Sequence, residues 1–200
     1  MARARIFFDR ALSLDPDNID ALLGSARVDL VAGALLFVTD PEAALVAAET
    51  KATKTLSLVP DHPRGHSTLG IVCIVTRRAA QGIAGCEHAL ALDRNLATAH
   101  AHIGLGKIYI GRAEETEAHI DAALRLSPRD TMAYNWMNFA GLAKNYLGLH
   151  DEAVQWSRRA IEANRNYPFP NFNLGVALAR LARIRGFVVG KSCFAIFLDS

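Results

Sequence analysis

The sequence lacks the features that would place it quickly in a common functional class. Its three cysteines, Cys73, Cys86 and Cys193, form no CxxC motif and cannot all pair with one another, which favours a reducing compartment. The net charge is only +2 with 21% charged residues, so no basic excess points to a nucleic acid or an anionic membrane. We therefore expect a cytoplasmic protein with no nucleic-acid partner and no membrane partner.

Long hydrophobic runs are absent too. No apolar stretch approaches the roughly 20 residues that a transmembrane helix needs. The N-terminal segment carries arginines, but Asp9 and Arg10 interrupt what would be the apolar core of a signal peptide. Neither a membrane span nor a secretion signal is predicted.

No group of residues predicts catalysis. The segment Gly190-Lys191-Ser192 is similar to the end of a phosphate-binding loop, but only three residues separate Gly186 from Gly190 where that loop needs four. His100 and His102 lie two residues apart on a predicted helix and point to different faces, which does not make a metal site. We predict no enzymatic activity, no cofactor and no metal.

What the sequence does contain is an internal repeat. The hexapeptide Ala89–Arg94, ALALDR, returns as Ala123–Pro128, ALRLSP, after 34 residues, a period typical of helix-turn-helix solenoids. In such an array each unit packs only on its neighbours. Equivalent segments begin, at separations of 44, 34, 34 and 37 residues, at Ala11, Thr55, Ala89, Ala123 and Ala160.

A second position recurs in the helix that precedes each of these segments. Gly70, Gly104 and Gly175 occupy it, with Ala26 and Asn138 as departures. Glycine inside a helix costs about 1 kcal/mol relative to alanine. Its recurrence predicts a close approach between the two helices of one repeat.

These residues give the chain a resemblance to tetratricopeptide repeat (TPR) proteins. The matching features are the pairs Leu69-Gly70, Ile103-Gly104 and Leu174-Gly175, the alanines that begin the repeated segments, and the terminal prolines Pro16, Pro60 and Pro128. The sequence departs from the family where a bulky aromatic is preferred, at Leu22, His66, His100, Tyr134 and Asn171. The resemblance implies an all-α superhelical solenoid that binds a protein or peptide partner without catalysis.

The predicted domain organisation follows from the repeat. Residues 1–183 form the array, with partial repeats at 1–18 and 168–183 around full repeats at 19–62, 63–96, 97–130 and 131–167, and residues 184–200 form an atypical apolar tail. The predicted helices are Arg3–Leu14, Asn18–Val38, Pro41–Leu58, Pro63–Arg77, Ala80–Leu92, Leu96–Ile110, Ala113–Leu126, Thr131–Leu147, Asp151–Ala163 and one from Pro168 that fades near Arg183.

The resemblance also implies a concave groove lined by the first helix of each repeat. The side chains that usually line it correspond here to Arg64, Ile71, Ile74, Ala101, Leu105, Ile108, Tyr109, Asn135, Phe139, Leu142, Phe172 and Val176. Few of them are charged, so the clamp with which some family members hold a peptide carboxylate is not expected. An apolar row at these positions would bind an apolar or amphipathic helical segment. The alternative is that the long helices or the tail fill the groove from within.

Both ends of the chain favour a second hypothesis, self-association into a homodimer. The array starts with a second-type helix whose first helix is missing, which leaves Ile6 and Phe7 short of partners. Either the sequence is a piece of a longer protein or another chain covers this face. The tail is a divergent cap, a dimerisation segment or the product of a shifted reading frame, and its apolar residues Phe187, Phe194 and Phe197 are candidates for the same interface.

Short phrases of the sequence carry a further resemblance. Glu87–Leu96, Gly111–Ala118 and Glu162–Pro168 resemble the repeat regions that close bacterial adenylate/guanylate cyclase-type signalling proteins and winged-helix regulators. This resemblance implies a regulatory or signalling scaffold whose output domain lies elsewhere.

Overall fold

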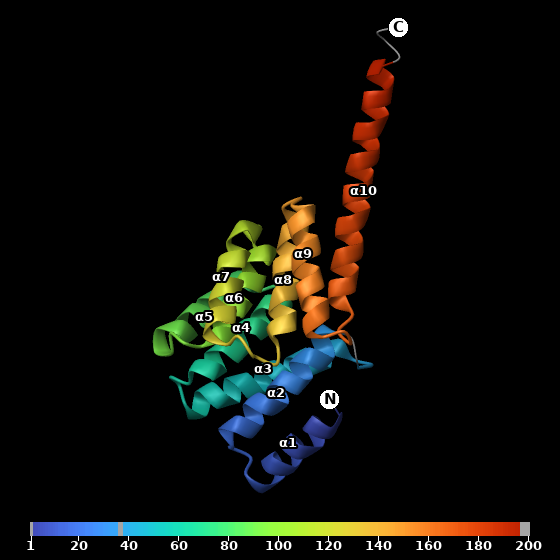
Figure 1. Cartoon of the computed structure of the whole chain (residues 1–200). Coiled ribbons are helices and arrows are strands. Elements are labelled where there is room, and N and C mark those ends of the chain that lie inside the picture. The colour runs from blue at the N-terminus through green and yellow to red at the C-terminus, as the bar shows by residue number, and fades with distance from the viewer. Residues whose placement is uncertain (1, 36–37, 197–200) are drawn as a thin grey trace. The chain divides into compact units, whose positions relative to one another are not determined.

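The computed structural model describes residues 2–35 and 38–196, with side chains described at 3–35 and 38–183. This part of the chain is all-helical and forms helix-turn-helix repeats (Figure 1). The helices are α1 (Ala2–Leu14), α2 (Ile19–Ala34), α3 (Pro41–Leu58), α4 (Pro63–Val75), α5 (Ala79–Leu92), α6 (Ala97–Tyr109), the 3-10 turn η1 (Ala113–Glu115), α7 (Thr116–Leu126), α8 (Ala133–Tyr146), α9 (His150–Ala163) and α10 (Phe169–Ile196). We call the even-numbered helices opening helices and the odd-numbered ones closing helices.

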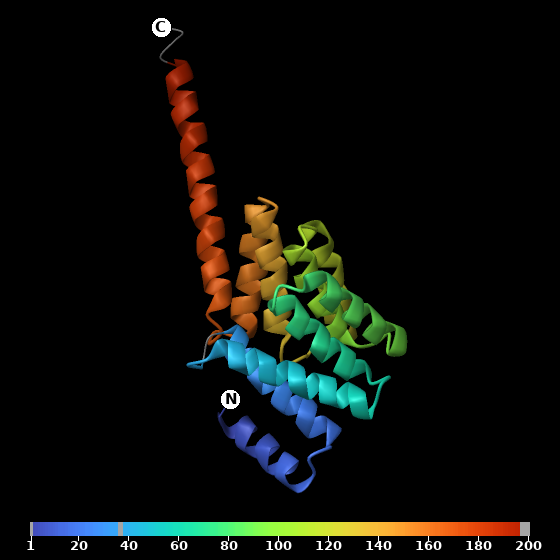
Figure 2. The same cartoon turned by 180° about the vertical axis from the view of Figure 1, so that it is seen from behind.

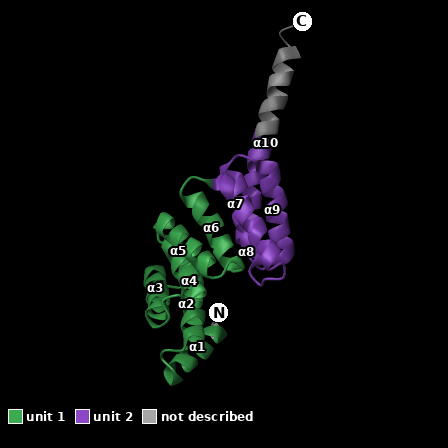
Figure 3. Cartoon of the chain, turned by 90° about the vertical axis from the view of Figure 1, so that its left-hand side faces the viewer, with its two compact units in different colours: residues 1–112 green, residues 113–200 purple. Residues whose placement is uncertain are grey.

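The chain divides into two compact units, which are coloured separately in Figure 3. Unit 1, residues 1–112, contains α1 to α6, and unit 2, residues 113–200, contains η1 and α7 to α10. Each unit is described by itself below.

Unit 1 is built from two helical hairpins, α2–α3 and α4–α5, with α1 packed on α2 and α6 packed on α5 (Figure 2). Short polar side chains start α2 and α3. Asn18 Oδ1 accepts from the Ala21 amide at 3.0 Å, and Asp40 Oδ1 accepts from the Ala43 amide at 2.9 Å, with Pro41 at the first position of α3.

Small residues hold the hairpins of unit 1 close together. A Cβ added at Gly70 would lie 2.6 Å from Cys86 Sγ and 2.8 Å from the Gly82 carbonyl oxygen, so only glycine fits on α4 against α5. In the α2–α3 hairpin Ala48 and Ala52 are completely buried. The close approach that the recurring glycine predicts is confirmed at Gly70.

Unit 2 contains the hairpin α8–α9, with α7 packed on α8 and α10 packed on both α9 and α8. Here the predicted register is wrong by three residues. It is Gly141, not Asn138, that faces the closing helix, since its added Cβ would lie 3.0 Å from Ser157 Oγ and 3.6 Å from the Ala153 carbonyl oxygen. The extra three residues of this repeat therefore lie before α8, and we call Gly70, Gly141 and Gly175 the glycine position of their helices.

The residue that ends an opening helix recurs at a fixed distance from the glycine position. The residues seven after Gly70, Gly104 and Gly141 are Arg77, Gly111 and Gly148, and all three have positive φ, at 65°, 79° and 74°. This left-handed residue lets the chain reverse into the next helix.

Helix α10 has no such reversal, because the seventh residue after Gly175 is Ala182 and the next, Arg183, is also helical. Alanine and arginine favour the helix. The helix therefore continues to Ile196 instead of fading near Arg183 as predicted. At the other end of the chain α2 ends at Ala34, four residues before the predicted Val38.

None of the described helices combines the length and the hydropathy required to span a bilayer.

Candidate peptide-binding surface

Three asparagines join α8 to α10 in unit 2. Asn173 Nδ2 donates to Asn138 Oδ1 at 2.8 Å, and Asn145 Nδ2 donates to the Asn173 carbonyl oxygen at 2.9 Å. Asn138 is 5% exposed, so its amide group is held in a fixed position. We call Asn135, Asn138, Asn145 and Asn173 the amide row.

Tyr167 orients the first member of the amide row. Its hydroxyl donates to Asn135 Oδ1 at 2.7 Å. Burial raises the pKa of Tyr167 to about 12, so this hydroxyl keeps its proton at neutral pH and remains a donor. Among the described residues, no hydrogen bond uses the Nδ2 groups of Asn135 and Asn138. Both amide groups therefore keep a donor that these bonds do not use.

Aromatic and apolar side chains flank the amide row on α10. Tyr167, Phe169 and Phe172 form a series, with ring centroids 5.3 Å and 6.4 Å apart. Phe172 is 69% exposed and Val176 is 49% exposed, while Phe139 and Leu142 of the predicted groove are half-buried. This part of unit 2 combines exposed apolar groups with fixed polar ones.

The equivalent helices of unit 1 carry a different pair at the same register. Ser67 Oγ of α4 and His102 Nδ1 of α6 are hydrogen-bonded at 3.0 Å, and these residues are 35 apart, as are Asn138 and Asn173. Burial lowers the pKa of His102 to about 4, which keeps its ring neutral at pH 7.

The apolar groove residues predicted in unit 1 are not exposed as the prediction requires. Among the apolar residues of this set, Tyr109 alone is exposed, at 56%. The charged member, Arg64, is also exposed, and it pairs with Asp20 at 3.1 Å. Packing between neighbouring helices covers the others, which are Ile71, Ile74, Ala101, Leu105 and Ile108. The contiguous exposed row expected from the sequence is therefore interrupted.

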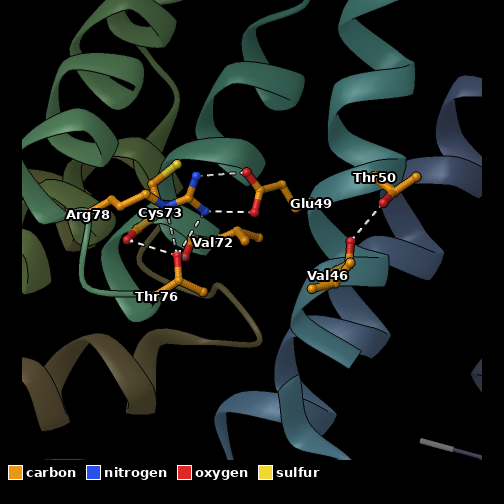
Figure 4. Close-up of polar contacts among 7 residues, drawn as sticks. All are labelled: Val46, Glu49, Thr50, Val72, Cys73, Thr76 and Arg78. Atoms are coloured by element: carbon orange, nitrogen blue, oxygen red, sulfur yellow. Dashed lines mark hydrogen bonds and ion pairs between the residues drawn. The ribbon is translucent and has the colours of Figure 1, made fainter. Parts of the chain in front are cut away.

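A second polar cluster of unit 1 ties α3 to the turn between α4 and α5 (Figure 4). The Arg78 guanidinium donates to both carboxylate oxygens of Glu49, at 2.8 Å and 2.7 Å, and to Thr76 Oγ1 at 3.0 Å. The hydrogen bond from Arg78 lowers the pKa of Glu49, so the pair stays ionised.

Beside the Arg78–Glu49 pair lies an open hollow of about 300 Å³, lined by Val46, Glu49, Thr50 and Thr53 of α3. All four residues lie on a single helix, and the carboxylate among them is already paired. The cluster therefore serves to position helices.

The cysteines of unit 1 behave as small core residues. Cys73 and Cys86 are buried free thiols, and burial raises the pKa of Cys86 to about 12. Such a thiol does not form the reactive thiolate.

The residues predicted for self-association divide into two groups. Ile6 and Phe7 of α1 are 66% and 71% exposed, as expected for side chains that are short of packing partners. Phe187, Phe194 and Phe197 lie outside the residues whose side chains the structure describes.

Sequence reasoning identified Asn135 but missed Asn138, Asn145 and Asn173 as members of one surface. The signal was present in the turn glycines, because Gly148 follows Gly141 by seven residues as Gly111 follows Gly104. With that register, Asn138 and Asn173 fall on adjacent opening helices.

Comparison with known proteins agrees with this architecture. Residues 135–167 match the tetratricopeptide repeat model. No curated protein sequence matches the chain significantly. Among solved structures, the chain is similar to TTC0263, a thermophilic TPR protein of Thermus thermophilus, with 19% identity, a TM-score of 0.70, and coverage of 88% of this chain and 89% of that one.

Two further structures have the same repeat architecture. PilF of Pseudomonas aeruginosa shows 16% identity and a TM-score of 0.61, over 88% of this chain and 76% of its own. YrrB, described as a TPR protein with an unusual peptide-binding site, shows 19% identity and a TM-score of 0.54, over 86% of this chain and 81% of its own. The chain thus has the fold of a tetratricopeptide repeat array. Domains of this kind are generally non-catalytic modules for protein–protein interaction.

Proposed function

We propose that the chain is a protein-interaction scaffold that binds an apolar peptide segment across α8 and α10 of unit 2. The observation that carries this proposal is the amide row beside the exposed side chains of Phe172 and Val176. The Nδ2 groups of Asn135 and Asn138 would donate to peptide carbonyls, while Phe172 and Val176 would bury apolar side chains. This arrangement suits an extended segment or the apolar face of a helix.

A peptide library selected against the full chain tests this proposal. Phe172→Asp and Val176→Asp together should reduce capture of the selected peptides at least tenfold, because both side chains are exposed and their replacement leaves the core intact. The matched control is Leu126→Asp, which is 41% exposed and lies on α7, outside the two helices that carry the amide row. Equal capture by the double variant and the control would remove α10 from the binding surface.

A second candidate function is self-association, favoured by the exposure of Ile6 and Phe7 on α1. Two large exposed apolar side chains that are consecutive on α1 make a suitable centre for an interface between copies. Light scattering on the full chain and on the Ile6→Glu, Phe7→Glu variant tests it. A mass equal to one chain for the unmodified protein would exclude this function at the concentration used.

The wider setting that we propose is a regulatory part of a cytoplasmic signalling protein. The resemblance of the repeat phrases to cyclase-type regulators supports it, as do the free thiols Cys73 and Cys86, which suit a reducing compartment. The domain composition of the full reading frame around this chain tests it, since an adjoining catalytic or DNA-binding domain is expected.

A further inference from the structure

Acidic and basic side chains lie on different helices of unit 2. The sequences of its opening helices, α8 and α10, contain no aspartate or glutamate. Between residues 113 and 196 the acidic residues lie on η1, on the closing helices α7 and α9 and in the turn before α8, and they are Glu114, Glu115, Glu117, Asp121, Asp130, Asp151, Glu152 and Glu162. The two helices that carry the amide row therefore contribute no negative side chain to its surface.

The cations of these two helices differ in how far they are neutralised. Lys144 of α8 is 7% exposed, and its Nζ pairs with Glu117 at 2.7 Å and with Glu152 at 2.5 Å. Arg180 and Arg183 of α10 are exposed, and among the residues with described side chains no ion pair neutralises either of them. Helix α10 therefore presents positive charge to solvent.

Both arginines lie on the side of α10 that the proposed function uses. Phe172, Val176, Arg180 and Arg183 follow one another at intervals of four, four and three residues, which places them in one line along the helix. Arg180 is also seven residues, about two turns, after Asn173, whose side chain donates to α8. It therefore lies near the edge of α10 that faces α8.

A second line of side chains, on α8, borders the same face. Asn135, Leu142 and Tyr146 are spaced by seven and four residues, and they lie on one side of α8 next to Asn138. Around α8 this line is turned in one direction from Asn138, and around α10 the line with the arginines is turned in the opposite direction from Asn173. Since the chain reverses into α9 and again into α10, the two opening helices run parallel, and both lines border one face.

The position of Arg180 stays open when other helices surround it. Arg180 is the fifth residue after Gly175, and its equivalent on α8 is Tyr146, the fifth after Gly141. Tyr146 is 70% exposed, although α7, α9 and α10 all pack on α8. The exposure of Arg180 therefore follows from its place in the repeat register.

The unused donors of the amide row favour an extended peptide over a helix. Among the described residues, the buried side-chain polar atoms without a partner are Ser25 Oγ and Ser157 Oγ. The Nδ2 groups of Asn135 and Asn138 are not among them, so solvent reaches both. The carbonyls of a helix are bonded within it apart from its last turn, whereas an extended segment leaves its carbonyls free to accept from such donors.

The helix geometry sets the distance between the apolar and the positive part of this surface. At a rise of about 1.5 Å per residue, Arg180 lies about 9 Å along α10 from the midpoint of Phe172 and Val176. An extended peptide advances about 3.3 Å per residue. About three residues of such a peptide therefore separate the side chain packed on Phe172 and Val176 from the one above Arg180.

We propose that the peptide bound across α8 and α10 is an extended acidic segment, in which an aspartate or glutamate about three residues from an apolar residue pairs with Arg180. Further carboxylates of the segment would pair with Arg183. This inference rests on the proposed function, because it names the class of peptide that the same surface binds. Charge complementarity carries it, since neither α8 nor α10 offers these arginines a carboxylate.

A phage-displayed library of short random peptides, selected in parallel against the full chain and against Arg180→Glu, tests the proposal. Peptides selected by the unmodified chain should carry aspartate or glutamate about three residues from a leucine, isoleucine or phenylalanine. The variant should select lysine or arginine at that place instead. The matched control is Arg158→Glu on α9, which makes the same charge change at an exposed position and should still select the acidic peptides.

Fluorescence anisotropy with one selected peptide measures the contribution of the ion pair. The analogue in which glutamine replaces the acidic residue should bind the unmodified chain about threefold more weakly, since an exposed ion pair contributes little. The acidic peptide should bind Arg180→Glu about tenfold more weakly, because like charges then face each other. Both losses should shrink at high salt, which screens exposed charges. Circular dichroism should show the same Tm for the chain, Arg180→Glu and Arg158→Glu.

The outcomes distinguish this inference from the proposed function. Selected peptides without an acidic preference, together with equal affinities of the peptide for the chain and Arg180→Glu, would overturn the inference and leave the proposed function in place. Failure of the unmodified chain to select any peptide would overturn both. Light scattering that shows two chains in the unmodified protein and one in Arg180→Glu would also overturn the inference, because a second copy would then occupy the face.

Discussion

Units 1 and 2 place different residues at the same points of one repeat register. The contact between adjacent opening helices is Ser67 to His102 in unit 1 and Asn138 to Asn173 in unit 2, and each pair is 35 residues apart. The register decides which residues meet, while the residue types decide what the contact can do. In unit 1 the pair includes a titratable ring, and in unit 2 it belongs to a row of neutral amides.

The surroundings of the two pairs also differ. Around Ser67 and His102 the apolar residues Ile71 and Leu105 are 6% and 5% exposed. Beside Asn138 and Asn173, Phe172 and Val176 are 69% and 49% exposed. The unit 1 pair thus lies among buried apolar side chains, whereas the unit 2 pair lies beside exposed ones.

The largest expected effect comes from adding one methyl group at the glycine position in each unit. Gly70→Ala should lower the free energy of unfolding by about 3 kcal/mol, because its Cβ would collide with Cys86 Sγ and the backbone oxygen of Gly82. Gly175→Ala should raise it by about 1 kcal/mol, since alanine favours the helix and meets no neighbour. Urea denaturation followed by circular dichroism measures both, and destabilisation by Gly175→Ala would show that another part of the chain packs against Gly175.

The second prediction uses pH to distinguish the Ser67–His102 pair, which contains a titratable ring, from the Asn138–Asn173 pair, which does not. His102 has a pKa of about 4 in the folded chain against an ordinary value near 6.5, so between these values the unfolded chain binds more protons. Stability should therefore be complete above pH about 6.5 and fall by about 2 kcal/mol as the pH drops to 4, a value reduced from the full linkage figure because the residue His102 as a whole has intermediate exposure.

The matched variant for this experiment is His102→Asn, which gives unit 1 the amide found in unit 2. Its unfolding free energy should change less between pH 7 and pH 4 than that of the unmodified chain. A smaller dependence of the same sign should remain, because burial also lowers the pKa of His62, whose Nδ1 caps α4 by accepting from the Gly65 amide. Identical pH profiles for the chain and His102→Asn would show that His102 does not titrate as its burial requires.

The third prediction concerns the amide pair itself. Asn173→Ala removes the donor to Asn138 Oδ1 and leaves that nearly buried oxygen without its partner, which should cost about 1 to 2 kcal/mol. A double-mutant cycle with Asn138→Ala measures the pair directly, and we expect a coupling of about 1 kcal/mol. Independent, additive losses would show that the two amides do not act together.

Much of the architecture could be predicted because it depends on local spacing. The 34-residue separation of Ala89 and Ala123 predicts helix-turn-helix repeats, and Asp40 before Pro41 predicts the start of α3. These features are determined by neighbouring residues in the chain, so no tertiary contact is needed to read them.

The candidate site could be predicted only in part, because it depends on contacts between helices. The spacing of the repeated alanines alone allows the three-residue insertion before or after α8, and the contact of Gly141 with Ser157 places it before the helix. When the insertion is placed after α8 instead, the alignment of the repeats puts Asn138 at the glycine position. Its hydrogen bond to Asn173 can then not be predicted. The exposure of the apolar groove residues could not be predicted from the sequence either. Ile71 and Phe172 are both apolar, but packing leaves Ile71 6% exposed and Phe172 69% exposed.

The smallest expected effect lies at the turn that ends α4. Arg77 has a φ of 65°, in the left-handed region, whereas Gly111 and Gly148 occupy the same place in the later turns. A side chain in this conformation costs about 1 kcal/mol that glycine avoids. Arg77→Gly should therefore raise the free energy of unfolding by somewhat less than about 1 kcal/mol, because glycine also gains freedom in the unfolded chain. The reverse substitution, Gly148→Arg, should lower it by a similar amount. Opposite shifts in the urea midpoint would confirm that both turns share one geometry, and a destabilising Arg77→Gly would mean that the Arg77 side chain itself supports the turn.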